Sequence, residues 1–260
     1  MNEIQLKVEQ LSKDFYREDG SKVIGLRDIQ FEIQKGELVS IVGTNGAGKS
    51  TLLNILAGML PADSGRIYLA DERIDHLNPL EYAKHIGRVF QDPRMGTAPR
   101  MTVFENLMLA QLRGEKRGFR RSLTPENKQK MSDLLKPFNL NLETLLDVPI
   151  DYLSGGQRQT VALLMATLKR PELLLLDEHT AALDPKTSKQ VMEETVAIVK
   201  QNQLTTLMIT HQLADALDYS DRILVLYQGH IHRAYTRDQI QGMTPGDLYM
   251  ILESLSQEVE

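Results

Sequence analysis

The sequence predicts an α/β fold with a nucleotide-binding core, an antiparallel β layer and an inserted α-helical lobe. Three observations support this prediction. A glycine-rich loop at residues 43–51 lies between an expected strand and an expected helix. Before it, apolar and polar residues alternate as they do in strands with one buried face. From about residue 95 to residue 168 the patterns are helical, and strand patterns then resume.

The glycine-rich loop matches the phosphate-binding pattern G-x-x-x-x-G-K-[ST] at every required position. Residues 37–42 read as a buried strand, and residues 50–56 as a helix that ends near Gly58 and Pro61. In this context backbone N–H groups converge on phosphate oxygens at a helix N-terminus, so a chance glycine-rich turn is the weaker interpretation. The loop predicts a P-loop NTPase core with a mixed sheet, whose binding residues are Gly43, Thr44, Asn45, Gly46, Ala47, Gly48, Lys49, Ser50 and Thr51.

Two of these side chains have expected roles in binding a nucleoside triphosphate. The Lys49 ammonium group is expected to reach the β- and γ-phosphates. The Ser50 hydroxyl is expected to coordinate Mg²⁺.

The segments before and after the loop predict the β layer. Residues 4–11 and 26–33 alternate apolar and polar side chains, and residues 67–69 follow a glycine turn. We expect these three segments to form antiparallel strands. Residues 86–93 read as a further short strand that ends at Gln91 and a proline.

The helical region begins with a capping-box pattern from Thr102 to Glu105, which opens a helix through about residue 112. A second helix is expected at residues 125–136. Phe104 and Leu107, one helical turn apart, are assigned to the core of this lobe. Met95 and Met101 are expected to border an adaptable groove for a membrane partner. Basic residues at 116–117 and 120–121 are interpreted as a solvated face.

The α/β pattern resumes after Pro171. Residues 173–178 are apolar until Asp177 and Glu178, as expected for a strand buried on both faces. A helix capped by Asp184 is expected to run to about residue 201. Buried strands are expected at 204–210, ending before His211, and at 223–226. A terminal helix is expected at 245–255.

Composition limits the classes of function. The chain has 260 residues, 42% of them hydrophobic, and a net charge of -5, which gives no general reason to expect nucleic acid. No window approaches the roughly 18–20 apolar residues that cross a bilayer. The N-terminus lacks a basic region followed by an apolar run, so no secretory signal is expected. Cysteine is absent, which excludes disulfides and thiolate metal sites. We expect a cytoplasmic protein that reaches a membrane only through a partner.

Two motifs carry the expected chemistry. Asp177 and Glu178 lie at the carboxyl end of a strand, where open α/β sheets place their sites. Asp177 is expected to hold Mg²⁺ through water, and Glu178 to polarise the water that attacks the γ-phosphate. The second motif, Leu-Ser-Gly-Gly-Gln at residues 153–157, opens a helix that runs to about residue 168. Its Ser154 is a natural N-cap, so the motif predicts a second anion site.

That five-residue motif is the signature of the ATP-binding cassette family, which the chain resembles from Leu6 to about Ile231. The resemblance implies that Phe15 stacks on adenine, with Tyr16 as the rival for that role. It implies that Gln91 links Mg²⁺ and the attacking water to the α lobe, and that His211 contacts the γ-phosphate. It also implies contacts to ATP from the signature and from the end of the segment 181–184, through Ser154, Gly155, Gly156, Gln157 and Asp184.

One position departs from the family pattern, because His179 stands where proline usually follows the two acids. The acids stay in register, so activity is still expected. Residues 177–185 and 95–98 resemble a branch of bacterial importers for amino acids such as tryptophan or tyrosine.

The resemblance implies one domain over residues 1–260. It comprises a RecA-like core with its β layer (1–93 and 170–235), the α lobe (94–169) and a C-terminal helix (244–257). Two chains, most simply identical, are expected to sandwich ATP and Mg²⁺ head to tail. Transmembrane permease subunits would dock on the lobe, on the inner face of the cell membrane, and an extracellular solute-binding protein would act indirectly.

Two other classes of function remain open at this point. A soluble cassette ATPase acting on nucleic acid or ribosomes tends to carry two cassettes, coiled-coil insertions or zinc-binding cysteines, which this sequence lacks. A module that binds ATP without hydrolysing it is disfavoured by the intact Glu178 and His211. The sequence therefore favours the ATPase subunit of a transporter that imports a small solute.

Overall fold

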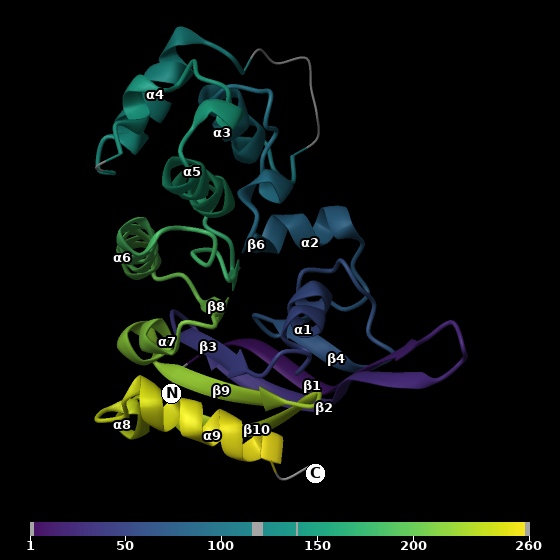
Figure 1. Ribbon diagram of the computed structural model, residues 1–260. Helices are drawn as coiled ribbons and strands as arrows, with labels where there is room; N and C mark the ends of the chain where they lie inside the picture. The colour runs from purple at the N-terminus through teal and green to yellow at the C-terminus, as the bar shows by residue number, and fades with distance from the viewer. Residues whose placement is uncertain (1–2, 116–121, 139, 258–260) are drawn as a thin grey trace.

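The computed structural model describes residues 3–115, 122–138 and 140–257 of the chain. Two sheets lie in its lower half and a helical lobe in its upper half (Figure 1), which confirms the predicted fold class. The basic residues at 116–117 and 120–121, interpreted above as a solvated face, lie outside the described residues.

The larger sheet has six strands in the order β10-β9-β3-β8-β7-β6. Pairing is parallel throughout, apart from the antiparallel pair of β9 and β10 at one edge, so the sheet is mixed as predicted. Its central strands read as apolar runs because both faces are covered. The strands are β3 (Leu38–Gly43), β6 (Ile86–Val89), β7 (Leu173–Asp177), β8 (Thr206–Ile209), β9 (Arg222–Tyr227) and β10 (His230–Thr236).

Three of these strands are shorter than the sequence predicted. β6 ends at Val89 and not at residue 93, because Pro93 opens a short 3₁₀ helix, Pro93–Gly96, that is capped by Asp92. β7 ends at Asp177, since Glu178 turns away with a positive φ of 45°. β8 begins at Thr206, two residues after the expected start. The first two differences place Gln91 and Glu178 on the loops that follow their strands.

The smaller sheet is the predicted antiparallel β layer, with strands in the order β2-β1-β4-β5. Two long strands form most of it, and β4 includes the predicted segment 67–69. The strands are β1 (Ile4–Tyr16), β2 (Lys22–Gln34), β4 (Ser64–Leu69) and β5 (Glu72–Arg73).

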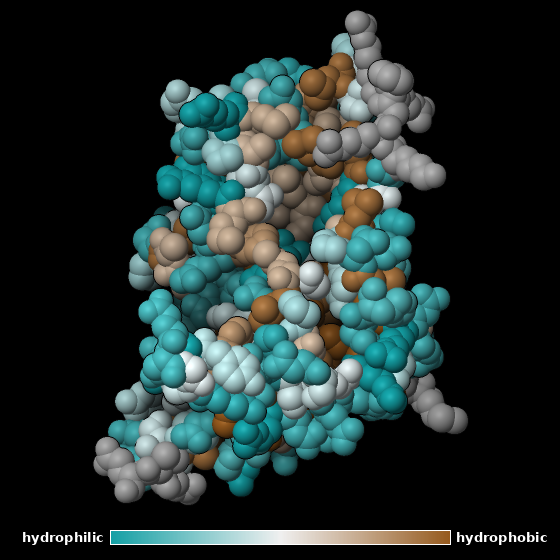
Figure 2. All heavy atoms as spheres, turned by 90° about the vertical axis from the view of Figure 1, so that its right-hand side faces the viewer, coloured by the Kyte–Doolittle hydropathy of each residue, from teal (hydrophilic) through white to brown (hydrophobic). Residues whose placement is uncertain are grey.

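The lobe is built from α3 (Val103–Gln111), α4 (Pro125–Leu135) and α5 (Gly155–Thr167), joined by 3₁₀ helices at Leu142–Thr144 and Ile150–Tyr152. The predicted capping box is present, because Thr102 and Glu105 exchange hydrogen bonds. Phe104 and Leu107 are buried in the lobe core, as predicted. Apolar residues also gather around a hollow in the upper half of the face in Figure 2. In the described part of 95–168, strand pairing is limited to one isolated bridge, between Thr102 and Pro149.

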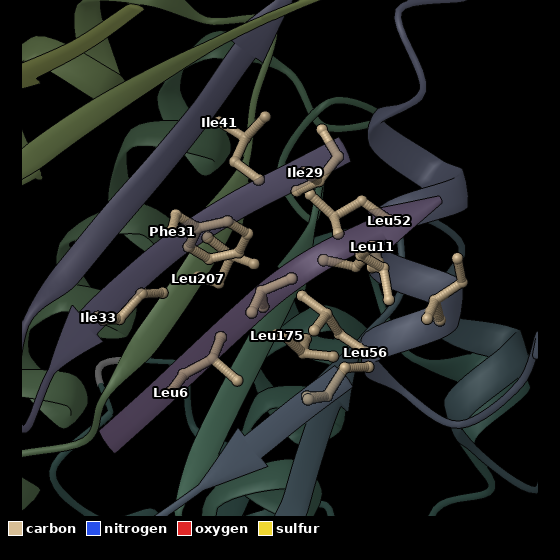
Figure 3. Close-up of a cluster of buried hydrophobic side chains, with 14 of the residues drawn as sticks. Leu6, Leu11, Ile29, Phe31, Ile33, Ile41, Leu52, Leu56, Leu175 and Leu207 are labelled. Atoms are coloured by element: carbon tan, nitrogen blue, oxygen red, sulfur yellow. The ribbon is translucent and has the colours of Figure 1, made fainter. Parts of the chain in front are cut away.

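The main core fills the space between the two sheets and helix α1 (Lys49–Leu56), which follows the glycine-rich loop. In Figure 3, side chains of the antiparallel sheet meet side chains of the six-stranded sheet and of α1. The former are Leu6, Leu11, Ile29, Phe31 and Ile33; the latter are Ile41, Leu175 and Leu207, with Leu52 and Leu56 from α1. This packing fixes the N-terminus of α1 against the carboxyl ends of the parallel strands.

The remaining helices lie around the sheets (Figure 1). Helices α6 (Pro185–Asn202) and α9 (Pro245–Gln257) were predicted, whereas α2 (Pro79–His85), α7 (Leu213–Tyr219) and α8 (Arg237–Ile240) were not. Helix α9 packs on α7 and β9 through Leu248 and Leu255. In the part of the chain that the structure describes, every helix is too short or too polar to cross a bilayer.

Candidate functional site

The glycine-rich loop joins β3 to the N-terminus of α1. Helix α1 begins at Lys49, and Gly48 before it has a φ of 103°, which strongly favours glycine. A Cβ at Gly48 would also lie 2.5 Å from the carbonyl oxygen of Gly25. The loop can therefore close tightly, and it leaves the first N–H groups of α1 free to bind an anion.

Lys49 is a buried cation held inside its own loop. Its Nζ donates to the carbonyl oxygens of Gly43 and Thr44, at 2.8 and 2.9 Å. Burial lowers the pKa of Lys49, an effect that the Glu178 carboxylate partly opposes. Among the described residues, no carboxylate lies within ion-pair distance of this ammonium group. A buried cation that is bound only to carbonyls is poised to take an anionic ligand.

A cavity of about 320 Å³ lies beside the loop, between β1, β2 and the ends of β7 and β8. It brings together residues that were predicted separately: Phe15, Glu178, His211 and most of the loop. The lining residues are Phe15, Val23, Ile24, Gly25, Asn45, Gly46, Ala47, Gly48, Lys49, Ser50, Thr51, Glu178 and His211.

The two aromatic candidates for the adenine contact differ in position. Phe15 lines the cavity and is 39% exposed, whereas Tyr16 is 72% exposed and outside the lining. The Phe15 ring lies over Gly25, where a Cβ would approach it to 2.5 Å. Glycine at position 25 therefore leaves room for the ring against β2.

Glu178 and His211 meet at the cavity. Their side chains follow the adjacent parallel strands β7 and β8, and His211 Nε2 lies 2.7 Å from Glu178 Oε1. The Glu178 backbone is in the left-handed region, which is uncommon for a residue other than glycine and often marks a functional position. Its N–H bonds to the carbonyl of Ile209 at 2.9 Å, which ties the turn to β8. This arrangement can orient a water molecule and accept its proton.

Asp177 ends β7 and makes an ion pair that the sequence analysis did not predict. Nη2 of Arg88, on β6, lies 2.7 Å from Asp177 Oδ2, and both side chains are largely buried. A lone arginine inside the apolar run at 86–90 was the available signal, since a charge in a buried strand needs a partner.

The expected magnesium ligands offer a fitting set of donors. Ser50, Gln91 and Asp177 supply hydroxyl, amide and carboxylate oxygens, the donors that a hard cation prefers. In the described part of the chain no three His, Cys, Asp or Glu side chains gather into a complete metal cage. A site with so few protein ligands is typical of Mg²⁺ bound together with substrate phosphates and water.

Gln91 lies outside the cavity lining. It is exposed in the loop between β6 and the 3₁₀ helix at Pro93–Gly96. The residue before it is anchored to the lobe, because Nε2 of the buried Gln159 donates to the Phe90 carbonyl at 3.2 Å. Sequence reasoning missed Gln159, which joins helix α5 to the Gln91 loop.

The signature residues form a second helix N-terminus, also outside the cavity lining. Ser154 caps α5, and its side chain and that of Gln157 exchange hydrogen bonds in a capping box. Gly156 packs against α6, where a Cβ would lie 2.4 Å from Thr187 Cγ2. Asp184 caps α6 by accepting from the Thr187 N–H. The signature and Asp184 thus adjoin each other, while the structure does not bring either to Lys49.

His179, in place of the expected proline, is a buried core residue. Its Nε2 lies 3.0 Å from Thr195 Oγ1 on α6. Burial lowers the pKa of His179 to about 4, so the ring is neutral near pH 7. The side chain links the turn after Asp177 to helix α6.

Comparison with known proteins agrees with this geometry. A model of the ABC transporter family matches residues 26–181. A tyrosine transport ATP-binding protein from Clostridioides difficile is 45% identical over 226 residues, which cover 87% of this chain and 90% of that protein. A phosphonates import ATP-binding protein from Lactococcus lactis is 35% identical over 232 residues, which cover 87% of this chain and 91% of that protein.

A solved structure shows the same fold. It is the dimeric, post-hydrolysis state of the ATP-binding cassette MJ0796 bound to ADP and phosphate. Its chain is 29% identical and superposes with a TM-score of 0.76, covering 89% of this chain and 98% of that one.

Proposed function

The chain belongs to the ABC transporter family, as the ATP-hydrolysing subunit, and we propose that it powers the uptake of an aromatic amino acid such as tyrosine. The observation that carries the catalytic part of this proposal is the Glu178–His211 pair, which faces the cavity beside the phosphate loop. The relative from Clostridioides difficile supports the cargo. The alternative of a soluble ATPase acting on nucleic acid or ribosomes finds no support among the relatives reported above.

ATP enters the cavity with its adenine on Phe15 and its phosphates in the loop. The partly exposed Phe15 ring offers a stacking surface, and the N–H groups at the start of α1 bind phosphate oxygens. Lys49 exchanges two carbonyl acceptors for the β- and γ-phosphates. Because a charge-assisted hydrogen bond is stronger than a bond to a neutral carbonyl, this exchange favours binding.

The metal ligands proposed here are Ser50, Asp177 and Gln91. When bound, Mg²⁺ neutralises charge that develops on the β- and γ-phosphate oxygens. Ser50 is the second residue of α1 and Asp177 ends β7, so both are held on the core. Gln91 is exposed on its loop, which lets it approach or leave the site as the lobe moves.

Hydrolysis needs a positioned water more than covalent chemistry. Glu178 orients the water and takes up its proton, and His211 holds the carboxylate and contacts the γ-phosphate. The hydrogen bond from Glu178 N–H to Ile209 keeps the carboxylate aligned with His211 on the next strand.

A second chain completes each ATP site in this proposal. The N-terminus of α5, with Ser154, Gly155, Gly156 and Gln157, is suited to phosphate but lies outside the cavity lining. The dimeric state of the MJ0796 cassette supports a head-to-tail pair, in which the signature and Asp184 region of one chain close the cavity of the other. We propose that the pair is a homodimer, and that residues 1–260 act as one domain with its lobe at 94–169.

The lobe offers a docking surface for the permease. A shallow groove of about 660 Å³ is lined by Arg94, Ala98, Pro99, Arg100, Met101 and Asp151. Met101 lines it as hypothesised, whereas Met95 is 67% exposed and outside the lining. The Gln91 loop runs directly into this groove, so movement at the ATP site reaches the partner. We propose that permease subunits bind here, at the inner face of the membrane, and receive cargo from an extracellular solute-binding protein.

The test is ATP-dependent uptake of radiolabelled tyrosine by vesicles that contain this subunit and its partner permease. Unlabelled tyrosine or tryptophan should compete with the label, and phosphonate should not. Uptake of labelled phosphonate, without uptake of labelled tyrosine, would contradict the proposed cargo. ATP hydrolysis without uptake of either compound would leave the ATPase intact and remove the cargo assignment.

A further inference from the structure

Arg88 joins three elements around the expected metal site. Its Nη1 donates to Oδ1 of Asn54 on α1 at 2.8 Å, and its Nη2 donates to Oδ2 of Asp177 at 2.7 Å. The Arg88 side chain is 10% exposed and that of Asp177 is 16% exposed. The guanidinium also lies 4.5 Å from the centre of the Phe90 ring, which restricts its plane.

Both acceptors lie next to expected magnesium ligands. Asn54 follows Ser50 by four residues on α1, so the two side chains lie on the same face of the helix. Asp177 is itself an expected ligand and belongs to β7. One guanidinium group therefore bridges the two elements that carry Ser50 and Asp177.

We propose that Arg88 is a positioning residue for the metal site: it holds the Asp177 carboxylate in a fixed orientation and at a fixed separation from helix α1. This inference rests on the proposed roles of Ser50 and Asp177. Lysine is a poor substitute, because the planar arginine group directs two N–H donors along fixed lines, whereas the lysine ammonium is a compact charge on a flexible stem. With one oxygen of Asp177 bound to Arg88, the other is left for the metal and its water.

Arg88 could affect Mg²⁺ binding in a second way, through its charge, and this effect would change the Mg²⁺ affinity in the opposite direction. A cation beside Asp177 repels Mg²⁺, so a purely electrostatic role predicts that loss of Arg88 tightens metal binding. A positioning role predicts weaker metal binding, since groups that orient metal ligands typically contribute about 10- to 100-fold in affinity. The direction of the change therefore distinguishes the two.

The experiment measures the affinity of the purified protein for a non-hydrolysable ATP analogue, first in EDTA and then during a titration with Mg²⁺. The variants are Arg88→Met, Arg88→Lys and Asn54→Ala. Arg73→Met is the matched control, because Arg73 makes an exposed ion pair with Asp75 away from the site. Thermal unfolding checks that each variant is folded.

Arg88→Met should raise the Mg²⁺ concentration for half-saturation about tenfold and leave binding in EDTA within about twofold of wild type. Asn54→Ala should raise this Mg²⁺ concentration by a smaller factor. Arg88→Lys should raise it nearly as much as Arg88→Met does. A structural role alone would weaken binding equally with and without Mg²⁺. That result, or a lower Mg²⁺ requirement, would overturn the inference.

The same titration separates this inference from the proposed site. If Mg²⁺ does not strengthen binding of the analogue to the wild-type protein, the proposed metal site itself is wrong. If Mg²⁺ strengthens binding of the analogue equally in the wild type and in all three variants, only the role of Arg88 is wrong. Should Arg88→Met fail to fold, Arg88→Lys and Asn54→Ala carry the test, because each keeps one of the two bonds available.

Discussion

Nε2 of His211 lies 2.7 Å from Oε1 of Glu178, at the ends of two neighbouring parallel strands. The contact places one carboxylate oxygen against the imidazole and leaves the other for water. It also sets Glu178 within the cavity that the phosphate loop lines.

Glu178→Gln should keep ATP binding and lower the hydrolysis rate by about 10²- to 10⁴-fold, because the amide keeps the shape of the side chain and cannot take up a proton. Bound ATP should then persist and hold two chains together. Phosphate release and size-exclusion chromatography with ATP measure these two effects. Glu172→Gln, at the other end of β7, is the control and should hydrolyse ATP normally. Near-normal hydrolysis by Glu178→Gln would remove it from the role of base.

Phe15→Ala should weaken ATP binding about tenfold through the loss of stacking on adenine. Tyr16→Ala is the matched control, since Tyr16 is a neighbouring aromatic outside the cavity lining, and it should bind ATP within about twofold of wild type. Fluorescence titration with a labelled ATP measures both affinities. A larger loss in Tyr16→Ala than in Phe15→Ala would reverse the assignment.

His179 should make the nucleotide-free protein sensitive to acid. Its pKa is lowered from 6.5 to about 4 in the folded protein. Between pH 6.5 and pH 4 the unfolded chain therefore binds a proton more readily than the folded protein does. The free energy of unfolding therefore falls as the pH drops from 6.5 to 4, by about 3 kcal/mol from this residue.

Urea unfolding at several pH values measures this effect. His179→Gln keeps a nitrogen donor for Thr195 and does not titrate. Its free energy of unfolding should therefore fall by about 3 kcal/mol less than that of the wild type between pH 6.5 and pH 4. Equal acid sensitivity of the two proteins would show that the fold does not keep His179 neutral.

Replacing both Met95 and Met101 by Glu should prevent co-purification with the permease, because a carboxylate in the groove at position 101, and a second one at the exposed position 95 near it, resist burial under a partner. ATP binding and thermal stability should stay unchanged. The control is Met250→Glu, because Met250 on α9 is about as exposed as Met95. Wild-type yields of permease with the double variant would place the docking surface elsewhere.

Much of this fold could be predicted because its signals are local. The phosphate loop and the capping box at Thr102 are encoded by neighbouring residues, and so is the cap of α6 by Asp184. Helix α2 carried the same kind of signal, since Asn78, Pro79 and Glu81 form an N-cap, a first-turn proline and a capping box. It was missed because the helix is only seven residues long and buries a single side chain, Tyr82.

Other features depend on tertiary contacts that no local pattern carries. Strand β10 is an edge strand with mostly exposed side chains, so it lacks the apolar run of its neighbours. The ion pair of Arg88 with Asp177 joins strands that are adjacent only in the folded sheet. The positive φ of Glu178 likewise accompanies a hydrogen bond to Ile209 on β8, which is distant in sequence.

The central claim is that each ATP site is shared between two chains, and one mixing measurement tests it most directly. Lys49→Ala disables the phosphate loop. Ser154→Asp keeps a good helix cap and places a negative charge where phosphate should bind. Each variant alone should therefore be inactive. The two are co-expressed with different tags, and the doubly tagged complex is purified for a measurement of ATP hydrolysis.

In a head-to-tail pair, one of the two sites then combines an intact Lys49 with an intact Ser154. The mixed complex should regain about half of the wild-type hydrolysis rate, because one site in two is restored. If the mixed complex is as inactive as the separate variants, or if Ser154→Asp alone hydrolyses ATP at the wild-type rate, the shared site is contradicted.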